Sequence, residues 1–357
     1  MPVSMVIFIG IFAQFFYNLI CSLLRSLGDS ETPLIFLLFS TVLNIGLDLL
    51  FIVYFRLGVI GAAAATATAQ AASAIMCLIY AFWKYPELHL SGKDFRFDPS
   101  LYIKHLMQGI PMGLQFSVLA IGIIVMQRAL VAFDLGADGV MVAGNPAQNG
   151  FGAANKLNYF LMCPLSALGT AIVSFNAQNL GAGRQDRIRR ATLKCLMIGT
   201  AMCLVLGCIG MLMTINGAYQ HVFMSLEKIS SQSIHYGNIY LYVDLALYFL
   251  LMLLYVLRSG VQGVGQSEFT LLAGCAELVA RTAICAFLPS IVNGGPIDSS
   301  ASVGAYIALC LGDPGAWILA IATLLYPTAR YLFGVSPRKI CRIEKKRQRK
   351  TMMNQDH

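Results

Sequence analysis

Long apolar runs constrain this chain more than any other feature of its sequence. A helix that crosses a bilayer needs about 20 mainly apolar residues, and such runs recur along almost the whole chain. They lie at 3–24, 33–54, 57–83, 106–133, 151–178, 193–215, 234–257, 269–290 and 314–333. In lipid, only helices satisfy their own backbone over runs of this kind. The sequence therefore predicts an all-α polytopic membrane protein with about nine transmembrane helices.

Composition and motifs narrow the function classes. Only 12% of the residues are charged and the mean hydropathy is +0.70, whereas soluble domains carry roughly 25% charged residues. The chain contains no HExxH, GxSxG or Walker motif, so the sequence predicts neither an enzyme nor a nucleotide site. No cofactor, catalytic residue or metal site is predicted. A transporter without a nucleotide site would draw its energy from an ion gradient.

The positive charges indicate how the chain lies in the membrane. Most of the 25 Lys and Arg residues fall in the loops 84–105 and 179–192 and in the tail 334–357. Cytoplasmic loops are enriched in these residues, so we expect a multi-pass protein of the plasma (inner) membrane with a cytoplasmic C-terminus. The basic tail is typical of a topology anchor that also contacts anionic membrane lipid. We therefore predict no nucleic-acid partner.

Two observations indicate that helices are missing upstream of Met1. Nine spans place Met1 outside, with no positive flank to orient the first helix. The segments Arg25–Glu31 and Gln262–Glu268 also resemble each other, since both contain the pattern Gly-x-Ser-Glu between two spans. Parallel repeats of this kind occur in transporters. If spans one to three repeat as seven to nine, spans four to six lack their counterparts.

Several segments together resemble the multidrug and toxic compound extrusion (MATE) transporters. The clearest are Ala153–Asn158, Met162–Gly169 and Gln178–Arg187, and weaker ones are Leu24–Asp29, Asn44–Asp48, Gly58–Ala64, Gly109–Pro111 and Glu277–Arg281. The resemblance extends over about residues 10–335. It implies an incomplete two-lobe (6+6) fold in which this chain is similar to helices four to twelve.

The resemblance also implies a domain organisation and a function. Residues 1–83 would be a partial N-lobe of three helices, 84–105 the cytoplasmic linker, 106–333 a C-lobe of six helices and 334–357 the tail. The implied function is secondary active antiport. Cationic or amphipathic organic compounds would be exported while sodium or protons enter, so the implied partner is a small organic cation. An N-lobe carboxylate that many members use for proton coupling lies on the first helix, which this chain lacks.

Ionisable residues inside the spans are the candidate functional residues, since burying a charge at a helix centre costs roughly 2.5–3.5 kcal/mol. Asp244 lies near the middle of its span, and Tyr240 and Tyr248 lie one turn to either side. A carboxylate between two phenols suits ion coordination, a proton relay or cation recognition. The alternative is a packed polar contact within the lobe.

Two further pairs have the spacing of four residues that places side chains on one helical face. Glu277 and Arg281 would form either a structural ion pair or part of a coupling network with Asp244. Asn44 and Asp48 would either line the cavity or make interhelical hydrogen bonds.

Asn155 and Lys156 open the fifth span, and Pro164 lies within it. The two polar residues would line the outer mouth of the cavity, or Lys156 would extend to the membrane interface. We expect Pro164 to kink this helix.

Two other functions remain open. A lipid-linked precursor flippase of the same superfamily would favour several cationic residues in the cavity, to bind a pyrophosphate, whereas Asp244 and Glu277 suit a cation. A truncated remnant that does not transport is the third possibility. The sequence indicates neither the oligomeric state nor the substrate.

Overall fold

The computed structural model describes residues 2–89, 98–136 and 138–334, and no β-strand occurs among them. Seven helices are long and apolar enough to cross a membrane, or eight if the bent pair α8 and α9 is one span. The first predicted span, 3–24, coincides with α1 (Pro2–Ser26), which is not among those eight. The predicted all-α membrane fold is confirmed. The chain forms two compact units, 1–98 and 99–357.

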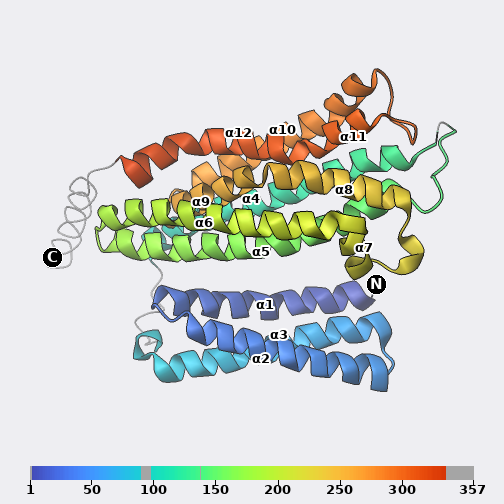
Figure 1. The fold of residues 1–357 in the computed structure, drawn as a ribbon. Helices are drawn as coiled ribbons and strands as arrows, with labels where there is room; N and C mark the ends of the chain where they lie inside the picture. The colour runs from blue at the N-terminus through green and yellow to red at the C-terminus, as the bar shows by residue number, and fades with distance from the viewer. Residues whose placement is uncertain (1, 90–97, 137, 335–357) are drawn as a thin grey trace. The chain divides into compact units, whose positions relative to one another are not determined.

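Three long helices lie within residues 2–89 of the first unit. They are α1, α2 (Glu31–Asp48), which continues as a π-helical turn (Leu49–Tyr54), and α3 (Gly58–Lys84). Within this unit α3 packs against both α1 and α2 (Figure 1). Ser73 on α3 donates a hydrogen bond to the Phe36 carbonyl at 2.7 Å. Such bonds hold helices together in an apolar solvent, where burial of apolar surface contributes little.

Asp29 joins the ends of these three helices. Its carboxylate accepts hydrogen bonds from the Thr32 hydroxyl at 2.6 Å, from the Tyr85 hydroxyl at 2.5 Å and from the Lys84 ammonium at 3.0 Å. Burial of this carboxyl raises its pKa, but the hydrogen bonds from Thr32, Tyr85 and Lys84 outweigh that effect and hold the pKa well below its usual range. The ionised carboxylate therefore stabilises this end of the unit.

The described residues of the second unit, 99–136 and 138–334, contain nine α-helices. They are α4 (Pro99–Val131), α5 (Pro146–Gly181), α6 (Gln185–Thr214), α7 (Ala218–Phe223), α8 (Ser231–Ala246), α9 (Tyr248–Gly263), α10 (Ser267–Asn293), α11 (Val303–Cys310) and α12 (Gly312–Pro327), which ends in a π-helical turn, Thr328–Phe333. α5 contacts α6, α8 and α9, and α10 contacts α4 and α12. One hydrophobic cluster runs through these helices.

Small residues allow α5 and α8 to approach closely. A Cβ atom at Gly150 would overlap the backbone of Ser233 and lie 2.9 Å from the Gly237 nitrogen. Gly150 and Gly237 therefore bring the two backbones together, as small residues do between membrane helices. This contact positions the polar face of α8 beside α5.

Helix breaks fall where the sequence did not predict them. The predicted span 234–257 is divided into α8 and α9, which are bent by 54° around Leu247. By contrast, α5 remains helical through Pro164, so the kink that we expect there does not end the helix. A lost hydrogen bond at a membrane proline can be compensated by neighbouring groups, so proline alone does not locate a break.

Two predicted loop regions contain helix. α4 begins at Pro99, inside the predicted linker 84–105, and α11 occupies part of the predicted loop 291–313. Residues 90–97 of the linker and 335–357 of the predicted tail lie outside the described residues.

Candidate functional site

A cavity of about 250 Å³ lies among five of the long helices of the second unit. α4 and α5 form one part of its wall, and α9, α10 and α12 form another, with Tyr240 from α8. Its lining residues are Leu119, Ile123, Met126, Phe151, Asn155, Asn158, Tyr159, Met162, Tyr240, Leu251, Leu254, Tyr255, Arg258, Glu277, Arg281, Asp313 and Trp317. Most of these are apolar or aromatic, and four of them are charged: Arg258, Glu277, Arg281 and Asp313. Such a cavity is typical of a small-molecule site.

Asp244 lies next to this cavity and is almost completely buried, with 1% of its surface exposed. The Asn158 amide donates a hydrogen bond of 2.6 Å to Oδ2 of Asp244, and the same nitrogen lies 3.3 Å from the Tyr240 hydroxyl. The other carboxylate oxygen, Oδ1, has no hydrogen-bond partner among the described residues. A buried carboxylate oxygen without a partner is costly, so it marks a place where a proton or cation would bind favourably.

Polar contacts continue from Asp244 across the cavity. The Tyr240 hydroxyl donates to Oδ2 of Asp313 at 3.3 Å, and Nη2 of Arg281 lies 2.7 Å from the other oxygen of Asp313. The sequence of contacts is thus Asp244, Asn158, Tyr240, Asp313 and Arg281. These groups come from α8, α5, α12 and α10, so a change of charge at one end can be felt on four helices.

A second ion pair lies on the same cavity wall. Nη2 of Arg258 on α9 is 2.5 Å from Oε1 of Glu277 on α10. Of the two alternatives predicted for Glu277 and Arg281, the ion pair between them is therefore wrong, because each residue is paired with an opposite charge on a facing helix. Three acids therefore lie at or beside the cavity. Glu277 is paired with Arg258 and Asp313 with Arg281, whereas Asp244 has no cationic partner within ion-pair distance in the described part of the chain.

The two tyrosines predicted beside Asp244 differ in their roles. Tyr240 belongs to the polar network, but the helix breaks at Leu247, so Tyr248 starts α9 instead of continuing the same face. The Tyr248 hydroxyl is buried and has no hydrogen-bond partner among the described residues. The predicted arrangement of one carboxylate between two phenols on one helical face is wrong.

The remaining predicted residues lie apart from the network. Asn155 lines the cavity, whereas Lys156 lies in a different pocket and donates a hydrogen bond of 3.2 Å to the Phe223 carbonyl. Asn44 and Asp48 belong to the first unit. The Asn44 amide is 3.4 Å from the Thr66 hydroxyl, and Oδ1 of Asp48 has no partner among the described residues.

Sequence reasoning missed two of the paired residues. Arg258 lies just after the predicted span 234–257 and Asp313 lies just before the predicted span 314–333, so neither is among the ionisable residues predicted inside a span. The structure places Asp313 in the first turn of α12, where a negative charge is favoured by the helix dipole. No group of three or more His, Cys, Asp or Glu side chains in the described residues is arranged to hold a metal ion.

Comparison with known proteins identifies the family. The profile of the MatE family matches residues 2–50 and 124–287, which is more than half of the chain. The chain belongs to the MatE family. It is 36% identical over 182 residues to a Bacillus subtilis protein named "Probable multidrug resistance protein YpnP", and 25% identical over 244 residues to another named "Probable multidrug resistance protein YoeA". These matches cover 51% and 66% of this chain but only 38% and 49% of the two relatives.

Solved structures show the same fold. A crystal structure of a MATE protein in a straight conformation matches with a TM-score of 0.75 and 19% identity, and the match covers 92% of this chain and 69% of that one. A transporter of the wider superfamily from Pyrococcus furiosus, described as having a binding pocket of reversed polarity, matches with the same TM-score, identity and coverage. The chain is therefore a multi-pass membrane protein of the MatE family, and the family consists of transporters.

Proposed function

We propose that this MatE chain acts in a secondary active antiporter that exports cationic or amphipathic organic compounds in exchange for sodium or protons. The observation that carries the proposal is Asp244, a buried carboxylate without a cationic partner, hydrogen-bonded through Asn158 to a cavity wall. We further propose that the units 1–98 and 99–357 correspond to a partial N-lobe and a C-lobe. The positive charges support a location in the cell membrane with a cytoplasmic C-terminus.

The charge balance of the cavity favours a cationic ligand. Two arginines neutralise two of the three acids, and Asp244 remains. An isolated ionised carboxylate in an apolar setting costs several kcal/mol, so it takes up a proton, a sodium ion or an organic cation. One acid that can be neutralised by either of two competing cations is the simplest basis for exchange, because entry of one then promotes release of the other.

The cavity walls suit an aromatic or amphipathic cation. Phe151, Tyr159, Tyr255 and Trp317 all line it, and ring faces attract cations by about 0.5–2 kcal/mol. A pyrophosphate would need free cationic groups instead. Arg258 and Arg281 are both occupied by carboxylates, so this cavity supports the antiporter over the flippase.

Ion binding can be followed with the tryptophan of the cavity. The chain has two tryptophans, so Trp83→Phe leaves Trp317 as the only reporter. We expect the fluorescence of Trp317 in detergent to change on addition of sodium or on acidification in sodium-free buffer, and Asp244→Asn to abolish the change. The matched control is Asp138→Asn, which removes an exposed acid outside the cavity. No response of the parent to either cation would overturn the proposal.

Transport is tested in a host that lacks its own drug pumps. We expect Asp244→Asn to raise ethidium accumulation to the level of cells without the protein, at unchanged abundance in the membrane, while Asp138→Asn behaves like the parent. Because the chain spans about half or less of the length of the two curated relatives, the comparison is made both for the 357-residue chain and for a version that continues into the upstream reading frame. If Asp244→Asn exports ethidium normally in both versions, the coupling role of this residue is wrong.

A further inference from the structure

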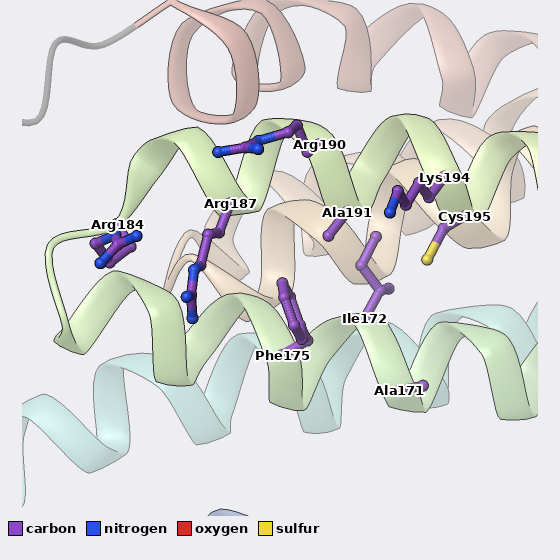
Figure 2. A pocket seen from close by; sticks show the side chains of 9 residues that line it. All are labelled: Ala171, Ile172, Phe175, Arg184, Arg187, Arg190, Ala191, Lys194 and Cys195. Carbon is purple, nitrogen blue, oxygen red and sulfur yellow. The ribbon is translucent and has the colours of Figure 1, made fainter.

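A groove of about 730 Å³ lies between α5 and α6, near the turn that connects them, and it shares no lining residue with the cavity beside Asp244. Its floor is apolar and comes from α5, with Ile172 and Phe175 as the largest side chains. Its other wall is the first three turns of α6, which carry a series of cationic side chains. Figure 2 shows Arg187 and Lys194 extending from α6 toward α5 on either side of Phe175 and Ile172.

Only part of this positive charge is neutralised within the protein. Asp186 accepts a hydrogen bond of 2.6 Å from Arg190 and lies 3.6 Å from Arg184. Arg187 and Lys194 have no acidic side chain within ion-pair distance in the described residues, and both are exposed. The groove therefore carries two unneutralised cations that face the same space.

The spacing of these two residues explains why they act together. Seven residues are two helical turns, so Arg187 and Lys194 stand on one face of α6 about 10 Å apart along its axis. Arg190 also lines the groove, but it is paired with Asp186. An anion placed between the two side chains would be attracted by both, and the intervening Ala191 leaves room for it.

The position of the groove in the fold determines what kind of anion it suits. α5 and α6 are both candidate membrane spans, and the groove lies where α5 ends and α6 begins. At such a place one end of a ligand meets the polar interface and the other meets hydrocarbon. Phe175 is 42% exposed on the apolar floor, so it offers contact area to a chain that runs along α5 away from the cations.

We propose that this groove binds an anionic phospholipid, with its phosphate between Arg187 and Lys194 and an acyl chain along Phe175 and Ile172. A soluble phosphate would use the cations but not the floor, and a zwitterionic lipid would use the floor but carry an ammonium toward the cations. Basic pockets between membrane helices are known to suit anionic headgroups. Anchoring the α5 to α6 turn in this way would hold the end of α5, the helix that supplies Asn158 to the cavity network.

The test uses the full 357-residue chain, purified in detergent and delipidated. Binding of phosphatidylglycerol and phosphatidylcholine with the same acyl chains is measured by native mass spectrometry and by the rise in melting temperature. Inorganic phosphate and glycerol phosphate are the soluble arms. We expect phosphatidylglycerol to be retained and to raise the melting temperature, and the other three to have little effect.

Substitutions locate the site. We expect the double substitution R187Q/K194Q to weaken phosphatidylglycerol binding about 30-fold, at about 1 kcal/mol for each cation. The double substitution R189Q/K228Q removes the same charge outside the groove, since Arg189 lies over the Phe333 ring and Lys228 lies in the loop before α8, and should retain binding. Phe175→Ala should weaken lipid binding, whereas Phe160→Ala, which removes an exposed ring elsewhere on α5, should not.

Three results would overturn the proposal. Equal losses of phosphatidylglycerol binding in R187Q/K194Q and R189Q/K228Q would show that the lipid is attracted by the net charge of the protein and not by this groove. Glycerol phosphate binding as tightly as phosphatidylglycerol would make the groove a site for soluble anions. Equal retention of phosphatidylcholine would show that the cations do not select the lipid. Because the substituted side chains are exposed, the melting temperatures of the variants without lipid should equal that of the parent. None of these measurements depends on transport.

Discussion

The ion pair between Arg281 and Asp313 offers the sharpest test of the cavity structure. The two side chains are 8% and 15% exposed and lie 2.7 Å apart. At an effective dielectric constant of 20, this distance corresponds to an attraction of about 6 kcal/mol, which is offset by the cost of removing both charges from water. Asp313→Asn keeps the shape of the side chain but leaves Arg281 buried without an opposite charge. We expect a loss of about 3–5 kcal/mol.

A double-mutant cycle separates this interaction from other effects of the substitutions. Arg281→Gln alone should also destabilise, because Asp313 then lacks its partner, whereas R281Q/D313N removes both charges and should cost much less than the sum of the two losses. The coupling free energy should therefore be about 3 kcal/mol. At about 2–4 °C per kcal/mol for a unit of this size, each single substitution should lower the detergent melting temperature by roughly 6–20 °C.

The control cycle uses Glu277→Gln with Arg281→Gln. These residues share a helix face, but Glu277 is bound to Arg258 instead, so their coupling should be clearly weaker than that of Arg281 with Asp313. Melting in detergent and the abundance of each variant in the membrane provide the readout. A coupling of Arg281 with Asp313 below about 1 kcal/mol, or a larger coupling of Arg281 with Glu277, would show that the cavity charges are paired as the sequence predicted and not as the structure has them.

Two other substitutions test the packing of each unit. Asp29→Asn should destabilise the first unit by about 1.5–3 kcal/mol at neutral pH. Because the pKa of the Asp29 carboxyl is depressed in the folded state, the parent should keep this stabilisation above about pH 4 and lose it on further acidification. The control Glu31→Gln should change neither the stability nor its pH dependence. Gly150→Ala should separate α5 from α8 and cost about 1–3 kcal/mol, since a Cβ there would overlap the Ser233 backbone, while Gly152→Ala, which points into open space, should be neutral or stabilising. Melting curves that show equal effects of Gly150→Ala and Gly152→Ala would contradict the close contact of the two helices.

The sequence was sufficient to predict where the membrane helices lie, but not where a helix is broken. Apolar length locates a span because the bilayer sets it, and eight of the predicted runs coincide with the candidate spans of the structure. Nothing in the apolar sequence around Leu247 marks the bend of 54°, while the proline at position 164 does not end α5. Tertiary packing decides both cases, and a single sequence does not reveal it.

Partners on other helices were likewise beyond sequence reasoning. The spacing of Glu277 and Arg281 correctly placed both on one buried face of α10, but it could not show that α9 and α12 bring Arg258 and Asp313 to that face. Asp313 lies just before the predicted span 314–333, so the sequence did not place it on a helix. Proline is favoured in the first turn of a helix, and that is where the structure has Pro314.

The bend after Asp244 also bears on which ligand the cavity would take. Asp244 lies in the last turn of α8, two residues before its end at Ala246. The C-terminal end of a helix carries a partial negative charge from its free carbonyl groups, and this charge adds to that of the carboxylate. Broken helices with such ends occur where transporters bind sodium or protons. An anion would be repelled by both the carboxylate and the helix end, whereas a cation would be attracted by both. Because α9 begins at Tyr248, its positive N-terminal end lies beside this negative end and partly offsets it. The cation preference therefore rests mainly on Oδ1 of Asp244, which has no hydrogen-bond partner among the described residues.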